Sequence, residues 1–198
     1  PELVHAAMDR LVTAFLHRLD QFARLGVLSL NNGNFCIGSG GLGYTTDLPQ
    51  KDFDGQHVRP IDQWANATPQ IFSEVSPAMH EEFALRYERR WLERFGLTYY
   101  GCCEPLHHKI DLLRSIKNLR KISVSPLADT EIAARNIGRD YVFSLKPNPA
   151  WLAGDRWNLE GAMSDLRRTL DASKRHGCAV EIIMKDITTV GYEPRRLW

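Results

Sequence analysis

The feature that most constrains the fold is a repeated rhythm in the chain: a short apolar run, a polar loop, then a segment with helical periodicity. The apolar runs lie at residues 27–30, 97–102, 121–124, 141–145 and 179–184. They are continuous rather than alternating, as in strands that are buried on both faces. This repeat predicts an α/β fold in which helices cover a parallel sheet.

Helical periodicity covers residues 2–24, 76–95, 107–116, 129–137 and 158–176, and more weakly residues 61–72. The clearest helix begins at Ser76-Pro77, which supplies an N-cap and a first helical residue, and it ends before Gly96. Residues 33–43 contain five glycines without the spacing of a phosphate-binding loop. We expect a functional loop there, with a merely mobile insertion as the alternative.

A parallel sheet of this kind is either doubly wound or part of a (β/α)8 barrel. A doubly wound sheet would normally carry a glycine fingerprint after an early strand, and none is present. A complete barrel needs about 250 residues, more than the 198 of this chain. We therefore expect one domain over residues 1–198 that forms the C-terminal portion, about five βα units, of a TIM-type barrel. Its open sheet edges predict self-association.

Charge and hydropathy exclude several classes of function. The chain has 25 Lys and Arg against 24 Asp and Glu, a formal net charge of +1, so no nucleic-acid partner is expected. No apolar stretch approaches the roughly 20 residues of a membrane span, and the first residues lack the order of a signal peptide. These features predict a cytoplasmic protein whose cysteines are reduced thiols.

The stretch with the densest chemistry is L-T-Y-Y-G-C-C-E-P-L-H-H at residues 97–108. It reads as a strand that opens into a loop with two thiols, a carboxylate and two imidazoles. Cys102, Glu104 and His107 could together hold a zinc-like ion. In the alternative interpretation one of the adjacent thiols points into the core, and the two histidines begin a helix.

Polar residues also follow the other expected strands. The carboxyl ends of barrel strands open on one mouth, so these side chains are expected to converge there. A lysine at such a mouth can bind a carboxylate or, when desolvated, carry a proton. Asp129 is more simply an N-cap, and Cys178 a buried apolar residue. The candidate substrate-binding residues are Asn31, Ser125, Lys146, Asn148 and Asp186, with Lys185 as a catalytic candidate.

Three segments resemble one known superfamily. Residues 76–83 read S-P-A-M-H-E-E-F, which is similar to the helix start S-P-E-M-F-R-E-F of that superfamily. Residues 140–152 read D-Y-V-F-S-L-K-P-N-P-A-W-L, which is similar to a strand of the superfamily that ends in G-N-x-D-P-x-x-L. E-I-I-M-K-D-I at residues 181–187 takes the place of its last barrel strand. On these segments the chain resembles the uroporphyrinogen decarboxylase superfamily, which includes corrinoid-linked methyltransferases. The resemblance covers nearly the whole chain, as the C-terminal part of that barrel.

The resemblance also implies a site. In the methyltransferase branch, zinc is bound by His-x-Cys after one strand and by a Cys before Asp-Ile on the last. This chain keeps the cysteine as Cys102, has Tyr100 and Lys185 at the other two positions, and offers Glu104 and His107 as substitute ligands. In the decarboxylase branch, a histidine of the last strand would fall near Lys185.

These implications give three hypotheses. The first is a methyltransferase that acts on a small substrate with a small methyl donor or a corrinoid carried by a partner protein. Cys102 would be a metal ligand or thiolate, with Glu104 and His107 as its companions. Tyr100 would be a proton donor, and Lys185 and Lys146 would anchor anions. The second is a cofactor-independent decarboxylase, in which Lys185 and Tyr100 hold the carboxylate and protonate the carbanion. The third is a non-catalytic partner of a corrinoid protein.

Overall fold

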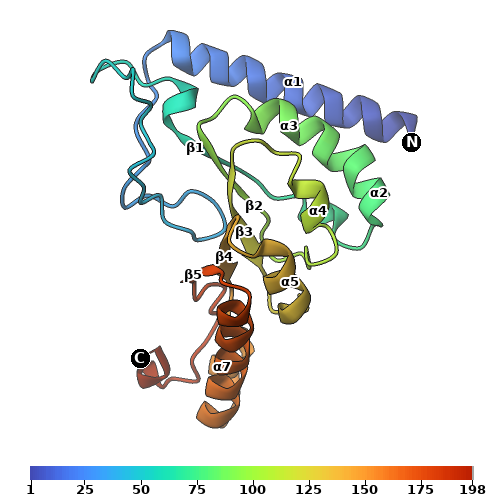
Figure 1. Ribbon diagram of the computed structural model, residues 1–198, viewed down its shortest axis with the longest axis vertical. Helices are drawn as coiled ribbons and strands as arrows, with labels where there is room; N and C mark the ends of the chain where they lie inside the picture. The colour runs from blue at the N-terminus through green and yellow to red at the C-terminus, as the bar shows by residue number, and fades with distance from the viewer. Residues whose placement is uncertain (198) are drawn as a thin grey trace.

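The computed structural model describes residues 1–197 and contains a five-stranded sheet in which all strands are parallel. The strands pair in the order in which they occur in the chain, and helical segments connect them (Figure 1). The α/β class predicted from the sequence rhythm is confirmed. The strands are β1 (Trp64–Ala67), β2 (Leu97–Tyr100), β3 (Leu119–Val124), β4 (Val142–Leu145) and β5 (Ala179–Ile182).

Helices α1 and α3 pack side by side at one end of the molecule, and α5 and α7 pack together toward the other (Figure 1). A π-helical turn, Glu81–Leu85, joins α2 to α3, so these segments form one continuous helix. The helices are α1 (Glu2–Arg24), α2 (Pro77–His80), α3 (Arg86–Leu92), α4 (Ile110–Leu113), α5 (Thr130–Ile137), α6 (Ala150–Ala153) and α7 (Leu159–Arg175). Short 3-10 turns lie at Pro60–Asp62, Gln70–Phe72 and Pro194–Leu197.

Side-chain caps fix the starts of the main helices. The Ser76 hydroxyl accepts a hydrogen bond from the Met79 amide at 3.2 Å, and the Asp129 carboxylate accepts one from the Ile132 amide at 2.9 Å. Each cap satisfies an amide that has no partner within the first turn. The interpretation of Asp129 as an N-cap is therefore confirmed. The helix expected over residues 107–116 is reduced to the single turn of α4.

Two predictions for the N-terminal part are wrong. Residues 27–30 form no strand, and the first strand of the sheet is β1, inside the segment that was expected to be helical. The 3-10 turns on either side of β1 account for the helical pattern there. Asn31 therefore does not follow a strand. Its side-chain amide instead pairs with the backbone of Trp64, donating to the carbonyl oxygen at 3.0 Å and accepting from the amide at 2.8 Å.

The sheet buries its two faces in different ways. On the helix-covered face, the fully buried side chains of Tyr100, Ile122 and Phe143 pack with apolar residues of α3, α4 and α5. Successive residues of a strand point to opposite faces, so Tyr99 and Ser144 lie on the other side. That second face is partly polar, and it carries the candidate site described below.

The glycine-rich loop covers the β1–β2 part of this second face. Ile37 and Leu48 pack there against side chains of β1 and β2, including Tyr99. A Cβ atom added to Gly38 would lie 2.7 Å from the Tyr99 ring, and one added to Gly41 would lie 2.9 Å from it. Only glycine permits this approach, so the loop rests directly on the Tyr99 ring.

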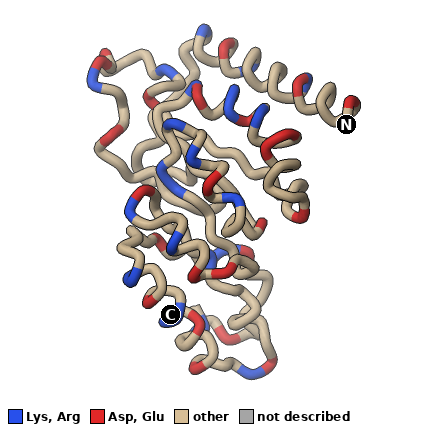
Figure 2. Tube along the Cα trace, turned by 45° about the vertical axis from the view of Figure 1, so that its right-hand side comes forward, with Lys and Arg blue, Asp and Glu red and all other residues tan. Residues whose placement is uncertain are grey.

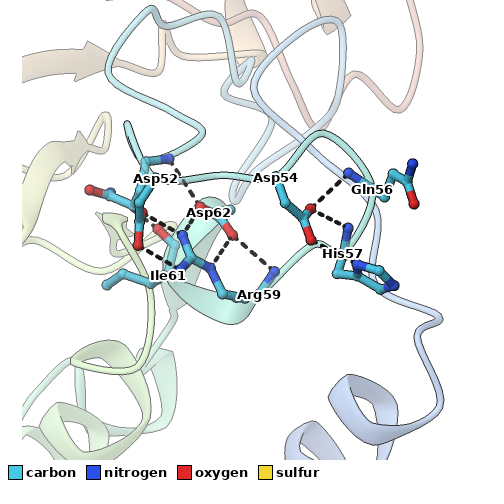
Figure 3. Close-up of polar contacts among 8 residues, drawn as sticks. Asp52, Asp54, Gln56, His57, Arg59, Ile61 and Asp62 are labelled. Atoms are coloured by element: carbon cyan, nitrogen blue, oxygen red, sulfur yellow. Dashed lines mark hydrogen bonds and ion pairs between the residues drawn. The ribbon is translucent and has the colours of Figure 1, made fainter.

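An ion-pair network holds the segment that leads into β1 (Figure 3). The Arg59 guanidinium donates to Asp52 at 2.7 and 2.8 Å and to Asp62 at 2.9 and 3.1 Å. Asp62 is fully buried and also accepts the amide hydrogens of Gln50 and Arg59. The hydrogen bonds from Arg59 lower the pKa of the Asp62 carboxyl. Asp54 separately accepts two backbone amides of the adjoining turn.

Charged residues of both signs are spread along the trace without a face of one sign (Figure 2). Within the described residues, no helix combines the length and the apolar character that crossing a membrane requires.

Candidate functional site

The candidate site lies on the second face of the sheet and at the carboxyl ends of β2 to β5. Parallel pairing aligns Ser123 on β3 with Ser144 on β4, and Ser144 with Glu181 on β5. Tyr99 on β2 is aligned with Lys121 on β3. Because residues paired across parallel strands share a face, these polar side chains lie together on one side of the sheet.

A lysine–tyrosine cluster, Tyr99, Ser144 and Lys146, forms the floor of the site. The Tyr99 hydroxyl and the Ser144 hydroxyl lie 2.9 Å apart. The Lys146 ammonium donates to the Tyr99 hydroxyl and to Ser144 Oγ, the latter at 2.8 Å. All three side chains are buried. Burial lowers the pKa of Lys146 to about 8 and raises that of Tyr99 to about 12, so Lys146 is the group of the floor that exchanges a proton near neutral pH.

An ion pair beside this floor anchors the glycine-rich loop. The Lys121 ammonium lies 2.8 Å from a carboxylate oxygen of Glu181 and donates to the carbonyl oxygen of Leu42 at 2.8 Å. It also lies 5.5 Å from the centre of the Trp64 ring. The loop is thereby tied to β3 and β5 as well as to β2.

A thiol cluster, consisting of Ser39, Cys102, Cys103, Lys185 and Asp186, lies at the exposed rim of the site. The Lys185 ammonium donates to Ser39 Oγ at 2.9 Å, to Cys102 Sγ at 3.2 Å and to Cys103 Sγ at 3.4 Å, and it lies 3.0 Å from the Asp186 carboxylate. The structure therefore brings together Cys102, Lys185 and Asp186 from segments that are more than 80 residues apart in the chain.

The thiol cluster gives its two sulfur atoms different acidities. Burial acts to raise the pKa of the Cys102 thiol, but hydrogen bonds from Ser39 and Lys185 outweigh it, so the pKa is lowered. Burial and the neighbouring Cys102 sulfur raise the pKa of Cys103. The pKa of Lys185 is raised despite burial, because Asp186 and the Cys102 sulfur stabilise its charge. Cys102 is therefore the more acidic thiol of the pair.

Tyr100 is placed on the opposite, helix-covered face of the sheet. Its hydroxyl donates to Glu88 at 2.6 Å and lies 2.8 Å from Nε2 of the fully buried His80. The side chain is completely buried, and burial raises its pKa well above the ordinary tyrosine value. The expected proton donor is therefore turned away from the mouth, and Tyr99 occupies the corresponding place in the site.

Glu104 and His107 do not join Cys102 in a ligand set. The Glu104 carboxylate is buried and accepts the backbone amide of Cys102 at 3.0 Å, while its other oxygen has no hydrogen-bond partner. The His107 ring contacts the His108 ring, with centres 4.1 Å apart and planes tilted by 51°, and the His107 carbonyl oxygen accepts a hydrogen bond from Asn136 on α5. Among residues 1–197, no group of three or more His, Cys, Asp or Glu side chains is placed to hold a metal ion.

The side chains around the Cys102 sulfur also do not fit a zinc site of the kind that the resemblance implies. A zinc ligand needs its sulfur lone pairs directed at a cation. The Cys102 sulfur instead accepts hydrogen bonds from Ser39 and from the Lys185 ammonium. The positive charge of Lys185 occupies the place where a cation would bind, so these residues fit a thiolate better than a metal ligand.

Ser125 and Asn148 lie in a separate cavity at the ends of β3 and β4. This cavity of about 300 Å³ extends between β4, β5 and α7. The Ser125 hydroxyl accepts the amide of Leu127 at 3.3 Å, and the Asn148 side chain accepts the amide of Ala150 at 3.0 Å. Both residues thus order their own loops. Lys146 borders this cavity and directs its ammonium group into the lysine–tyrosine cluster.

Several residues of the site carried no sequence signal strong enough to select them. Ser39 lies in the glycine-rich loop and reaches Cys102 only because the loop folds back over the sheet. Tyr99 and Tyr100 are neighbours in an apolar strand, so the sequence does not show which of them faces the site. The pairing of Ser144 with Glu181 follows from strand register, which the sequence pattern alone does not define.

No family model, curated protein or solved structure matches this chain.

Proposed function

We propose that this chain forms part of a (β/α)8 barrel of the uroporphyrinogen decarboxylase superfamily, and that it transfers a methyl group from a corrinoid or small methyl donor. The five parallel strands in sequence order support the barrel assignment, and closing the barrel would require a further strand to displace Asn31 from the backbone of β1. The observation that carries the function is the contact of the Cys102 sulfur with the Lys185 ammonium and the Ser39 hydroxyl. These groups favour a thiolate, the form that attacks carbon.

In this proposal the Cys102 thiolate attacks the methyl carbon along the axis of the bond to the donor. A sulfur–carbon bond forms with the sulfur electron pair, and the bond to the donor breaks with its electron pair remaining on the donor. Lys185 holds the thiolate before the attack and attracts an anionic leaving donor afterwards. Asp186 keeps the Lys185 ammonium oriented through their 3.0 Å contact.

The test is to incubate the chain with methylcobalamin or with a methylsulfonium compound, and then to analyse the tryptic peptide of residues 95–109 by mass spectrometry. We expect the mass of one methyl group on Cys102, and none in the Cys102→Ser variant. Cys36, which is exposed, is the internal control for non-specific methylation. Equal methylation of Cys36 and Cys102, or no methylation of Cys102, would contradict the proposal.

The lysine–tyrosine cluster favours a second candidate, a cofactor-independent decarboxylase. Lys185 would bind the carboxylate, and the carbon–carbon bond would break with its electron pair left on the substrate carbon. The Lys146 ammonium, whose pKa burial lowers to about 8, would supply the proton that quenches the carbanion. Carbon dioxide release that is lost on Lys185→Ala but kept in Cys102→Ser would favour this candidate. Binding of a corrinoid protein that survives both substitutions would favour the non-catalytic partner.

A further inference from the structure

Two adjacent cysteines share the exposed rim of the site. The sulfur atoms of Cys102 and Cys103 lie 3.5 Å apart, on the irregular loop that follows β2. Both side chains are partly exposed, so a small molecule can reach them from solvent. One ammonium group, that of Lys185, donates to both sulfur atoms.

The surroundings of the pair assign different roles to its members. Cys102 accepts hydrogen bonds from Ser39 and Lys185, and its pKa is lowered although burial acts against this. Burial and the adjacent Cys102 raise the pKa of Cys103, which directs its sulfur toward the Asp186 carboxylate at 3.6 Å. The pair thus combines a more acidic thiol, which accepts two hydrogen bonds, with a less acidic thiol that donates toward a carboxylate; such a pair can react with an oxidant in two steps.

We propose that Cys102 and Cys103 form a hydroperoxide-reactive dithiol site, in which Cys102 is the attacking sulfur and Cys103 the resolving thiol. Its substrate class is hydrogen peroxide or a small organic hydroperoxide. The proposal goes beyond methyl transfer and does not depend on it, since it concerns the oxidation state of the two sulfur atoms.

The reaction balances in two steps. The Cys102 thiolate attacks the distal, hydrogen-bearing oxygen of the hydroperoxide, a sulfur–oxygen bond forms to give the sulfenic acid, and the O–O bond breaks. The departing oxygen takes a proton from solvent and leaves as water or an alcohol. The Lys185 ammonium, 3.2 Å from the Cys102 sulfur, would stabilise the negative charge that develops on the departing oxygen. Cys103 then attacks the sulfenic sulfur of Cys102, a disulfide bond forms, and the hydroxyl leaves with the Cys103 proton as water. Two sulfur atoms are oxidised by one electron each, and the peroxide is reduced.

Adjacency in sequence makes the product easy to reduce. Neighbouring Cα atoms across a trans peptide are about 3.8 Å apart, shorter than the range of about 4.4 to 6.8 Å found in ordinary disulfides. The bond therefore forms under strain, and strained, exposed disulfides are the labile ones. A cellular dithiol would return the site to its reduced form.

The other two cysteines provide internal controls. Cys36 is exposed and donates to the carbonyl oxygen of Gly38 at 3.1 Å. Cys178 donates to the carbonyl oxygen of Ala134 at 3.3 Å, and burial raises its pKa. Neither has a cationic donor or a second thiol among its described contacts, so we expect both to react slowly.

The experiment treats the fully reduced protein with a small molar excess of hydrogen peroxide, stops the reaction with acid, and identifies the products by mass spectrometry. Trypsin releases both cysteines of the pair in the peptide of residues 95–109. We expect this peptide to lose two hydrogen atoms and to regain them with dithiothreitol. In Cys103→Ser, a sulfenic acid should accumulate on Cys102 and be trapped by dimedone. In Cys102→Ser, the rate of peroxide consumption should fall by at least about tenfold.

The matched controls are Cys36→Ser and Cys178→Ser, which should leave the oxidation of the pair unchanged. Equal oxidation of Cys36 and Cys102 in the wild-type protein would overturn the proposal. So would a stable sulfenic acid on wild-type Cys102 without a disulfide, or oxidation of Cys103 that persists at the same rate in Cys102→Ser. Because the wild-type protein alone provides two of these outcomes, a variant that fails to fold would still leave the proposal falsifiable.

Discussion

Replacing Lys185 by Met tests the electrostatic argument for the Cys102 thiolate most directly. The substitution keeps much of the side-chain volume and removes the ammonium that lies 3.2 Å from the sulfur. Without this donor, the thiolate loses a charge-assisted hydrogen bond, and the pKa of Cys102 should rise.

The size of the effect follows from the contacts of Lys185. A hydrogen bond to a charged group contributes about 1.5 to 3 kcal/mol. Lys185 divides its charge among the two sulfur atoms and Asp186, although its side chain is only 18% exposed. The share that acts on Cys102 therefore falls just below this range, at about 1.4 kcal/mol, which is about a tenfold change in thiolate population below the pKa.

The assay is the rate of alkylation of Cys102 by iodoacetamide as a function of pH, with the labelled residue assigned by fragmentation of the peptide of residues 95–109. In the wild-type protein the rate should level off at a lower pH than for an ordinary thiol. In Lys185→Met the midpoint should move upward, and the rate at pH 7 should fall about tenfold.

Two control variants separate charge from structure. Lys185→Arg keeps the cation and should retain most of the wild-type profile, whereas Lys174→Met removes an exposed lysine at the end of α7 and should change nothing. An unchanged pH profile in folded Lys185→Met would refute the assignment of Lys185 as the group that stabilises the thiolate.

Three further predictions concern stability. Burial raises the pKa of Glu88 to about 7, so the stability that its protonated form contributes is complete below the unfolded pKa of about 4.3 and is lost as the pH rises through 7. Glu88→Gln should therefore raise the free energy of unfolding in urea by about 1–3 kcal/mol at pH 8. An equal gain at pH 4 would contradict this reasoning. Arg59→Met should lower the melting temperature at pH 7. The difference from wild type should shrink as the pH falls through the lowered pKa of Asp62, because that carboxylate contributes stability through the ion pair only while it is ionised. A difference in melting temperature that does not depend on pH would argue against the ion pair. In Gly43→Ala the added Cβ would lie 2.0 Å from the carbonyl oxygen of Asn31, so we expect a loss of about 1–3 kcal/mol by urea unfolding. The control Gly33→Ala should change little, since no atom lies within 4 Å of the added Cβ and Gly33 does not adopt a positive φ.

The sequence rhythm predicts the sheet well where strands are apolar and helices have caps. Strands β2, β4 and β5 fall within predicted runs, and β3 begins two residues before its run, because glycine, proline or polar residues end each of these strands. Strand β1 is missed because its sequence, W-A-N-A, has weak β-propensity. It becomes a strand through its pairing with β2, and such long-range pairing leaves no mark in a local pattern.

The site shows the same division between local and long-range information. The density of reactive groups at residues 100–108 and the lysine after the last strand identify Cys102 and Lys185, which the structure brings into contact. The face of each strand residue is not defined by an apolar run, so the resemblance that indicated Tyr100 could not show that Tyr99 is the tyrosine that faces the site. Glu104 is a neighbour of Cys102 in sequence, but its carboxylate is used to order the loop backbone.

The pairing of Asn31 with Trp64 affects how copies of the chain could associate. The outward backbone groups of β1 are largely occupied by side chains: Asn31 takes both groups of Trp64, and the Trp91 indole donates to the carbonyl oxygen of Asn66 at 3.3 Å. At the other edge, no strand among residues 1–197 pairs with the far side of β5. A sheet with only one available edge can join a single copy through that edge, about a two-fold axis, and then has no edge left for a third. Strand-mediated association of this chain would therefore stop at a dimer, whereas a sheet open on both sides could grow into a fibre.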